Sequence, residues 1–251
     1  MTLSASSQLA IPDWQGPLRA AINFGNPVLA QRSPDSEPMG VSVALAKALA
    51  RELGVPLEMV FYEAAGHVTA SVHEGKWDIA FCALDPVRAQ ELDFTAPYVL
   101  IEGTYLVWKD APFKAIDDID QADVEVSVGK GAAYDLFLTR ALKNAGLVRV
   151  STSAAAVEAF LDKQSTVAAG VRQPLERVAA ARQDLRVLPG SFTSIQQAMA
   201  KPKTGKLPID YLKDFVERQK NNGMVQAGLD ASGQAAASVA PLVAAGGRSV
   251  L

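Results

Sequence analysis

Two long extended segments interrupt an otherwise regular alternation of predicted strands and helices. The first is DFTAPYVLIEGTYLVWKDAP (93–112), which is too long for a single small sheet, and the second is FTSIQQAMAKP (192–202). Alternating strands and helices before and between these segments are typical of α/β units with parallel strands and right-handed crossovers. The sequence therefore predicts two α/β lobes, joined by two extended crossings, with a cleft between them. Small ligands commonly bind in clefts between domains.

Apolar periodicity and the positions of Gly and Pro set the expected bounds. Strands are expected at 18–24, 57–63, 77–84, 124–131, 147–151, 166–172 and 185–189, and helices at 40–55, 67–75, 132–146, 153–164, 174–183 and 208–223. The fold class is α/β, with two mixed, mostly parallel sheets flanked by helices. We expect a discontinuous first lobe (1–107 plus 198–251), a second lobe (108–197), and crossings near 104–110 and 190–199.

The composition limits the class of protein. A hydrophobic content of 49% and a mean hydropathy of +0.10 are typical of a folded chain with a substantial core. The net charge of −3 and the lack of a basic run argue against a nucleic-acid partner. No apolar stretch approaches the ~20 residues needed to cross a bilayer, so we expect no membrane insertion. We expect a monomer.

The first residues, MTLSASSQLAIPDW, lack the basic and apolar regions of a signal peptide. The chain as written is therefore expected in the cytoplasm, or in the periplasm if an export leader has been removed. The tail, residues 231–251, is rich in Ala, Gly and Ser, and its composition is compatible with disorder or with a short helix along the first lobe.

Metal and thiol chemistry are not expected. Cys82 is the only cysteine and lies in the apolar segment DIAFCAL, where it is predicted to be a small buried hydrophobe. His67 and His73 are six residues apart, which suits neither a helical nor a strand pair of metal ligands. We therefore predict no metal site and no metal catalysis, and we expect no cofactor.

Four segments, in order, resemble the bacterial extracellular solute-binding proteins of family 3, the amino-acid-binding, type II periplasmic family. They are GVSVALAKALARELGVPLEMV, EGKWDIAFCALDPVRAQELDFTAPYVLIEGTYLV, VSVGKGAA and FLDKQSTVAAGVRQP. The resemblance runs from about Leu18 to Gly233. It implies two lobes that close on a ligand without performing chemistry, and a membrane ABC permease as a possible partner.

Arg88 and a helix start are the main candidate binding groups. Arg88 follows the end of a buried strand, so its guanidinium can clamp a carboxylate in the cleft. The segment GKGAA leads into a helix, so the N–H groups of Ala132 and Ala133 are expected to form an anion seat. Contacts from both lobes to one carboxylate would couple binding to closure. The alternative is that Arg88 pairs with Glu91 or Asp93 at the surface.

The chain departs from the family pattern at two places. In amino-acid-binding members, a Ser or Thr assists the arginine, whereas here Ala83, Leu84 and Asp85 occupy that loop. The family's aspartate for the ligand ammonium aligns with Arg172. Two arginines favour an anionic ligand, such as a di- or tricarboxylate, a keto acid or a phosphorylated small molecule. The alternative is that Arg172 turns away and pairs with Glu176 on its own helix.

Other candidate ligand contacts come from both lobes. An aromatic platform of the family aligns near Ala65 and is missing. The expected polar and stacking partners at the end of the first strand are Asn23, Phe24 and Asn26. The further candidates are Ala83, His67, Lys130 and Gln173.

The sequence predicts a solute-binding protein that binds a small carboxylate-bearing metabolite by closure of two lobes. One alternative is an enzyme on the same scaffold, similar to cyclohexadienyl (prephenate or arogenate) dehydratases, with Glu176 as the nearby general acid. A second is a conventional amino-acid-binding protein, and a third is a cytoplasmic sensor or orphan binding protein.

Overall fold

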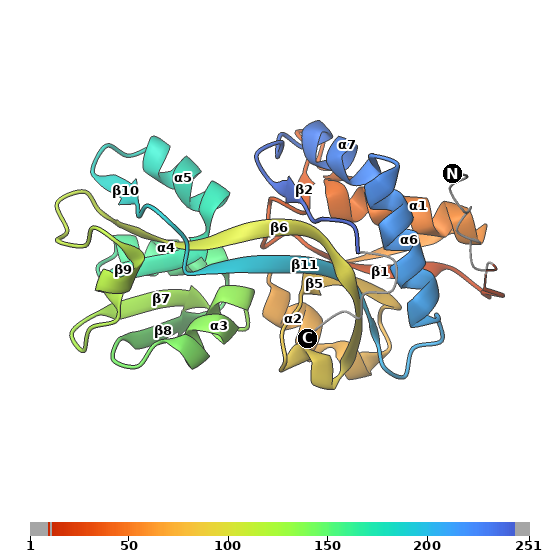
Figure 1. Cartoon of the computed structure of the whole chain (residues 1–251), viewed down its shortest axis with the longest axis horizontal. Helices are drawn as coiled ribbons and strands as arrows, with labels where there is room; N and C mark the ends of the chain where they lie inside the picture. Colours follow the sequence, from red (N-terminus) through yellow and green to blue (C-terminus); the bar gives the residue numbers. More distant parts are fainter. Residues whose placement is uncertain (1–9, 11, 244–251) are drawn as a thin grey trace, which may run out of the picture.

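The computed structural model of the chain describes residues 10 and 12–243. Two groups of elements lie side by side and are joined by two long strands, β6 (Leu92–Trp108) and β11 (Thr193–Pro202) (Figure 1). The first lobe contains β1 (Leu18–Asn23), β2 (Gln31–Arg32), β3 (Pro38–Met39), α1 (Val41–Leu53), β4 (Leu57–Tyr62), α2 (Ala65–Ala70), β5 (Ile79–Ala83), α6 (Ile209–Asn221), α7 (Met224–Ala231) and β12 (Ser238–Val239). The second lobe contains β7 (Glu125–Gly129), α3 (Ala133–Ala141), β8 (Gly146–Val150), α4 (Ser153–Leu161), β9 (Val167–Val171), α5 (Arg172–Ala180) and β10 (Leu185–Val187).

Strand β6 belongs to both lobes. The strands follow the order β4-β1-β5-β11-β6-β9-β7-β8, and β10 and β12 also pair with β6. Strands β1, β4 and β5 are parallel, as are β7, β8 and β9, whereas β11 runs antiparallel to β5 and β6. Between Leu92 and Gly103, β6 pairs with β11, and from Gly103 to Leu106 it pairs with β9. The two predicted sheets are therefore joined through β6.

The fold prediction is confirmed as a mixed α/β architecture of this type, and the two extended segments are β6 and β11. Strand β6 changes partner at Gly103, ahead of the predicted lobe boundary at residue 107. The residue ranges of the two lobes otherwise stay a prediction.

The predicted helix 132–146 is too long. Helix α3 ends at Ala141, because the Asp120 carboxylate accepts hydrogen bonds from the backbone N–H groups of Lys143, Asn144 and Ala145. These bonds hold the backbone out of helical geometry just before β8. The three bonds also lower the pKa of Asp120, so its carboxylate remains ionised at neutral pH.

The predicted helix 67–75 is divided at Ser71 into α2 and a 3₁₀ turn, Val72–Glu74. The hairpin β2–β3 and helix α7 were not predicted. In the tail, Ser238 and Val239 form β12 against Leu100 and Val99 of β6, so this part is neither disordered nor helical. Residues 244–251 of the tail lie outside the described residues.

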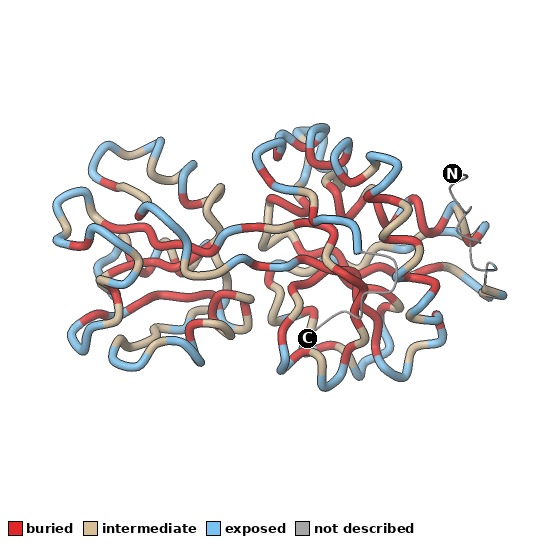
Figure 2. The backbone as a smooth tube through the Cα atoms, in the orientation of Figure 1, coloured by how far each residue is buried: buried red, intermediate tan, exposed pale blue. Residues whose placement is uncertain are grey.

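Most of the tube along the strands of both lobes is buried and drawn in red in Figure 2. Phe215 of α6 is fully buried in the first lobe, and Phe160 of α4 is fully buried in the second. The Phe160 ring lies 5.1 Å from that of Trp108, measured between centroids. Strand β6 supplies Tyr98 to the main buried cluster, which also contains Val126 of β7 in the second lobe, and it supplies Leu106 to a smaller cluster of the second lobe. The two clusters therefore share a strand, and the ends of β1, β5 and α3 face each other between the lobes.

Candidate functional site

Arg88 lies between the lobes, in the 3₁₀ turn that follows β5, and only 4% of it is exposed. Its Nη1 donates to the Ala83 carbonyl in the first lobe (3.0 Å), and its Nη2 donates to the Gly131 carbonyl in the second (2.9 Å). Its Nε is buried without a hydrogen-bond partner. A buried N–H of a charged group is costly to leave unpaired, so an acceptor at this position would stabilise the closed arrangement.

The alternative surface pairing of Arg88 is wrong. Glu91 lies 3.3 Å from His73, and Asp93 lies 3.1 Å from Lys201. The proline turn places Arg88 at the carboxyl end of β5, and the short 3₁₀ turn directs it inward rather than toward either acid.

A small cavity of ≈ 40 Å³ lies beside Arg88. It is formed where β1, β5 and β11 of the first lobe meet α3 and α4 of the second. Six predicted residues line it: Asn23, Asn26, Ala83, Arg88, Ala132 and Ala133. No acidic side chain is among its lining residues. Among the residues that the structure describes, Arg88 is therefore the one charged group that lines this cavity.

The amino end of α3 faces the same cavity. The Ala132 N–H donates to the Gly129 carbonyl (3.0 Å), so the prediction that this N–H is free was wrong. The open donors of the helix therefore begin at Ala133, because N–H groups of a first helical turn have no partner within the helix. The Asp135 carboxylate accepts a hydrogen bond from the Gly131 N–H (2.8 Å) and forms an ion pair with Arg149. Ala133 lines the cavity, and Asp135 does not.

The two lobes also contact each other beside the cavity. The Asp85 carboxylate, 4% exposed, pairs with Arg140 of α3 at 2.7 Å. Gly66 of α2 packs against the backbone of Lys130 and Gly131. Sequence reasoning noted Asp85 only as a replacement for a hydroxyl, because its partner is distant along the chain.

Gly66 is expected to be needed for this approach of the lobes. A Cβ at Gly66 would lie 2.6 Å from the Lys130 carbonyl oxygen, so Gly66→Ala should hold the lobes apart. Overpacking of this kind costs about 1–3 kcal/mol, which weakens ligand binding about fivefold to more than a hundredfold. Isothermal titration calorimetry and small-angle X-ray scattering would measure the weaker binding and the larger radius of gyration.

The melting temperature of the Gly66→Ala variant without ligand serves as the control. Gly66 lies inside α2, where alanine is the better helix former, so the melting temperature without ligand should stay the same or rise. Unchanged affinity in Gly66→Ala would contradict a role for this contact in binding.

Arg172 does not line the Arg88 cavity. It is the first residue of α5, and it forms ion pairs with Glu102 of β6 and, at 3.5 Å, with Glu176. It also donates to the Gly190 carbonyl. The structure therefore has the second of the two predicted arrangements, in which Arg172 pairs with Glu176. The neighbouring Gln173 also lies outside the cavity, with its Oε1 buried and unpaired.

Phe24, His67 and Lys130 line adjoining cavities rather than the one beside Arg88. Phe24 lines a cavity of ≈ 480 Å³, and the Arg32 guanidinium lies 4.2 Å above its ring. His67 and Lys130 are exposed and line another of ≈ 620 Å³, which also reaches Arg88. They are therefore rim residues in this structure.

Sequence reasoning missed three polar residues of the Arg88 cavity: Tyr134, Ser153 and Gln197. The Tyr134 hydroxyl donates to Ser153 Oγ (2.8 Å); burial raises its pKa, and the bond to Ser153 lowers it by less. Ser153 begins a predicted helix, so the rule applied to α3 could have found it. Gln197 lies in the predicted extended segment 192–202, which has no local signal for a cleft residue.

Cys82 also lines the cavity and is buried, as predicted. Burial raises the pKa of its thiol, and the nearby Arg88 charge lowers it by less. The thiol is therefore protonated at neutral pH and acts as an apolar wall.

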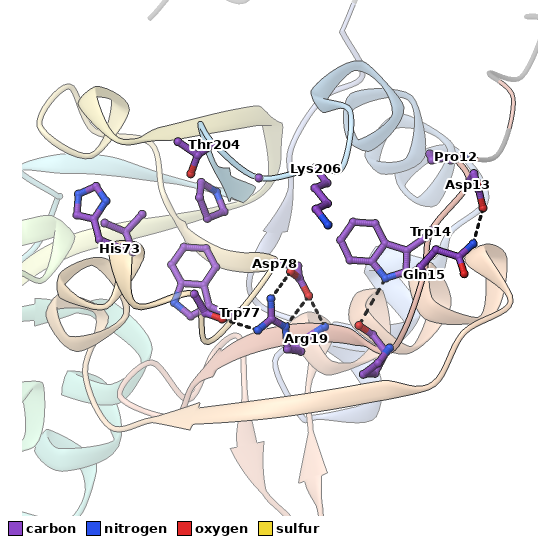
Figure 3. A pocket seen from close by; sticks show the side chains of 15 residues that line it. Pro12, Asp13, Trp14, Gln15, Arg19, His73, Trp77, Asp78, Thr204 and Lys206 are labelled. Atoms are coloured by element: carbon purple, nitrogen blue, oxygen red, sulfur yellow. Dashed lines mark hydrogen bonds and ion pairs between the residues drawn. The ribbon is translucent and has the colours of Figure 1, made fainter.

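A larger cavity, of ≈ 760 Å³, lies elsewhere on the first lobe (Figure 3). Arg19 and Asp78 face each other in it and form an ion pair at 2.7 Å, and Arg19 also donates to the Gly75 carbonyl. Trp14 lies on its other side. Lys206 and Asp13 also line it, and both are at the open surface, whereas Arg88 is buried between the lobes.

Residues 10 and 12–243 contain neither a cluster of metal-binding side chains nor a helix that could span a membrane. In this part of the chain, no three His, Cys, Asp or Glu side chains are grouped so that they could hold a metal ion. Within the same residues, no helix is both long and apolar enough to span a bilayer.

The structure is similar to several solved solute receptors. An amino acid ABC transporter substrate-binding protein, AbpA from Streptococcus pneumoniae, bound to L-arginine, matches with a TM-score of 0.75 and 24% identity, over 88% of this chain and 95% of that one. A receptor for L-cysteine of Neisseria gonorrhoeae matches with a TM-score of 0.76 and 22% identity, over 86% and 89%. The ancestral amino acid-binding protein AncCDT-1, a precursor of cyclohexadienyl dehydratase, has a TM-score of 0.71 and 23% identity, over 86% and 95%. At these identities the likeness shows the fold.

A curated relative, the amino-acid-binding protein AabA of Dichelobacter nodosus, is 26% identical over 137 residues. The match spans 53% of this chain and 53% of that protein, about half of each. The model of one protein family, the bacterial extracellular solute-binding proteins, family 3, matches residues 18–230. This match covers most of the chain and contains β1, Arg88, both crossing strands and the start of α3. The chain belongs to the bacterial extracellular solute-binding proteins of family 3.

Proposed function

We propose that the chain is the substrate receptor of an ABC-type transport system, and that it binds a small carboxylate-bearing metabolite between its lobes. The observation that carries this proposal is the buried guanidinium of Arg88. Among residues 10 and 12–243, its Nε has no hydrogen-bond partner, and Arg88 lines a cavity to which these residues contribute no acidic side chain. A carboxylate would accept hydrogen bonds from Nε of Arg88 and from the open backbone N–H groups of α3, which begin at Ala133.

Closure of the lobes is part of the proposal. The carboxylate would bridge Arg88 of the first lobe and α3 of the second, and the Asp85–Arg140 ion pair forms across the same gap. A ligand that contacts both lobes binds the closed state more tightly than the open one, so it shifts the population toward closure. The receptor would then present a closed form to the permease.

Two alternatives are supported less well. A conventional amino-acid ligand, the kind that the name of AabA indicates, would need an acceptor for its ammonium group, and the Arg88 cavity has no acidic lining residue. A dehydratase would need a general acid in the cavity, whereas Glu176 is half exposed and pairs with Arg172.

A thermal-shift screen tests the proposal. The protein is incubated with mono-, di- and tricarboxylates, phosphorylated metabolites and zwitterionic amino acids. A true ligand at 100 times its Kd stabilises the fold by about 2.7 kcal/mol, which raises the melting temperature by several degrees. Stabilisation by amino acids alone would contradict the proposal, as would turnover of prephenate.

A further inference from the structure

The Arg88 cavity adjoins a second and larger one. The second cavity, of ≈ 480 Å³, shares four lining residues with the first: Gly25, Asn26, Ser153 and Val171. The cavity beside Arg88 is only ≈ 40 Å³, too small for much more than a carboxylate group. Any larger ligand whose carboxylate lies on Arg88 must therefore extend into an adjoining cavity. The cavity of ≈ 620 Å³ shares only Arg88 with the first, and one of ≈ 210 Å³ shares Ala83, Ala133 and Ile195. The second cavity shares the most lining residues, and it is larger than the cavity of ≈ 210 Å³.

The second cavity is mainly apolar. In the second lobe, Val157 of α4 and Leu175 and Val178 of α5 line it, together with Ala169 of β9. Leu175 is buried in the small core of that lobe, and Val157 and Val178 are partly buried against it. Phe24 lines it from the first lobe. Such a surface favours a hydrocarbon chain or ring over a polar group.

The charged residues that line the second cavity are acidic. Glu63 and Glu158 line it, and both side chains are exposed. The Arg32 guanidinium is 4.0 Å from Glu63, the limit for an ion pair. Glu158 has no ion pair with any residue of the described ranges 10 and 12–243. A second carboxylate of a ligand would therefore lie near the charge of Glu158 and near that of Glu63, which the exposed Arg32 offsets only in part.

We infer that this cavity is the subsite for an apolar body, and that the ligand is a monocarboxylate with an alkyl or aryl chain. The inference rests on the proposed function, since it places the carboxylate on Arg88. It narrows the anionic class expected from the sequence: Arg172 lies outside the Arg88 cavity, and Glu63 and Glu158 disfavour di- and tricarboxylates. The apolar chain would lie along Val157, Leu175 and Val178.

Three acids of known length test the subsite by calorimetry on the full chain: propionate, hexanoate and adipate. Each buried methylene strengthens binding about threefold to fourfold, so hexanoate should bind roughly thirtyfold more tightly than propionate. Adipate has the same carbon chain as hexanoate and a second carboxylate, and it should bind about tenfold more weakly than hexanoate or worse. The double variant Glu63→Gln, Glu158→Gln should narrow the gap between hexanoate and adipate.

A pair of variants, one of which fills the second cavity with a larger side chain, provides a matched comparison. Val178→Phe should weaken hexanoate binding at least about tenfold and leave propionate unchanged, because only the longer acid reaches this wall. Arg177→Phe introduces the same side chain one position away, on the exposed face of α5, and should change neither.

The outcomes separate this inference from the proposed function. If Arg88→Met abolishes binding of all three acids but hexanoate binds no better than propionate, the subsite is overturned and the proposed function stands. An affinity for hexanoate that Val178→Phe does not change would likewise overturn the subsite and leave the proposed function standing. If Arg88→Met leaves acid binding unchanged, both ideas are overturned. If none of the three acids binds, the subsite is overturned, and the thermal-shift screen decides the proposed function.

Discussion

Arg88→Met should reduce the affinity for the best carboxylate of the screen by about thirtyfold to several thousandfold. Truncation of one partner of a buried, hydrogen-bonded charge pair costs about 2–5 kcal/mol, and the cavity beside Arg88 has no second cation to replace it. Methionine keeps much of the volume of the side chain, so the walls of the cavity stay in place. Calorimetric titration of the variant and the natural protein measures the loss.

Arg172→Met is the matched control, because it removes the same functional group just outside the cavity. Its ion pairs with Glu102 and Glu176 are partly exposed, so their loss should cost at most about 1 kcal/mol of stability and leave the affinity unchanged. Arg88→Lys keeps a positive charge without the planar fork, and its affinity should fall between those of the natural protein and Arg88→Met. A larger loss in Arg172→Met than in Arg88→Met would mean that the wrong arginine has been assigned to the ligand.

Phe160→Ala should destabilise the whole chain by about 3–5 kcal/mol, although Phe160 lies in the second lobe. For a chain of this length that corresponds to a fall in melting temperature of roughly 6–20 °C. We expect one unfolding transition by differential scanning calorimetry, because β6 contributes to both buried clusters and neither cluster is complete without it.

Phe215→Ala removes an equally buried ring from α6 in the first lobe and serves as the comparison. Cooperative unfolding requires that both variants move the same single transition. Two transitions, with Phe160→Ala moving one and Phe215→Ala the other, would show that the lobes unfold separately despite the shared strand.

The fold was largely predictable from the sequence, because its signals are local. The alternation of strand and helix patterns predicted most elements, and the length of segment 93–112 predicted an extended crossing between two lobes. The errors arose where distant groups act on the backbone: the Asp120 carboxylate ends α3, and β6 provides an edge that makes Ser238 and Val239 a strand.

The candidate site was predictable only in part. Arg88 could be found because its segment resembles the family pattern. The strand end and the turn alone were equally compatible with a surface pair to Glu91 or Asp93. The direction of Arg172 could not be found, because it depends on Glu102, which is 70 residues away along the chain. Glu63 and Glu158 meet at one cavity only after both lobes have folded, so no spacing in the sequence indicates that they act together.

The pairing of Gly103 with Thr193 has a consequence for how such a chain can be recombined. Gly103 lies in β6, where its strand turns from β11 to β9, and Thr193 is its direct partner at the start of β11. The polypeptide therefore enters the second lobe at Gly103 and leaves it at Thr193, two residues that are paired across neighbouring strands. A chimera spliced at these two positions would exchange α3, α4 and α5 with those of another receptor. The two proteins would then be joined at only two points, which lie next to each other in the sheet. The half of the site with Arg88 would be kept, and the half with the apolar walls would be replaced, so ligand class could be inherited in two separable parts.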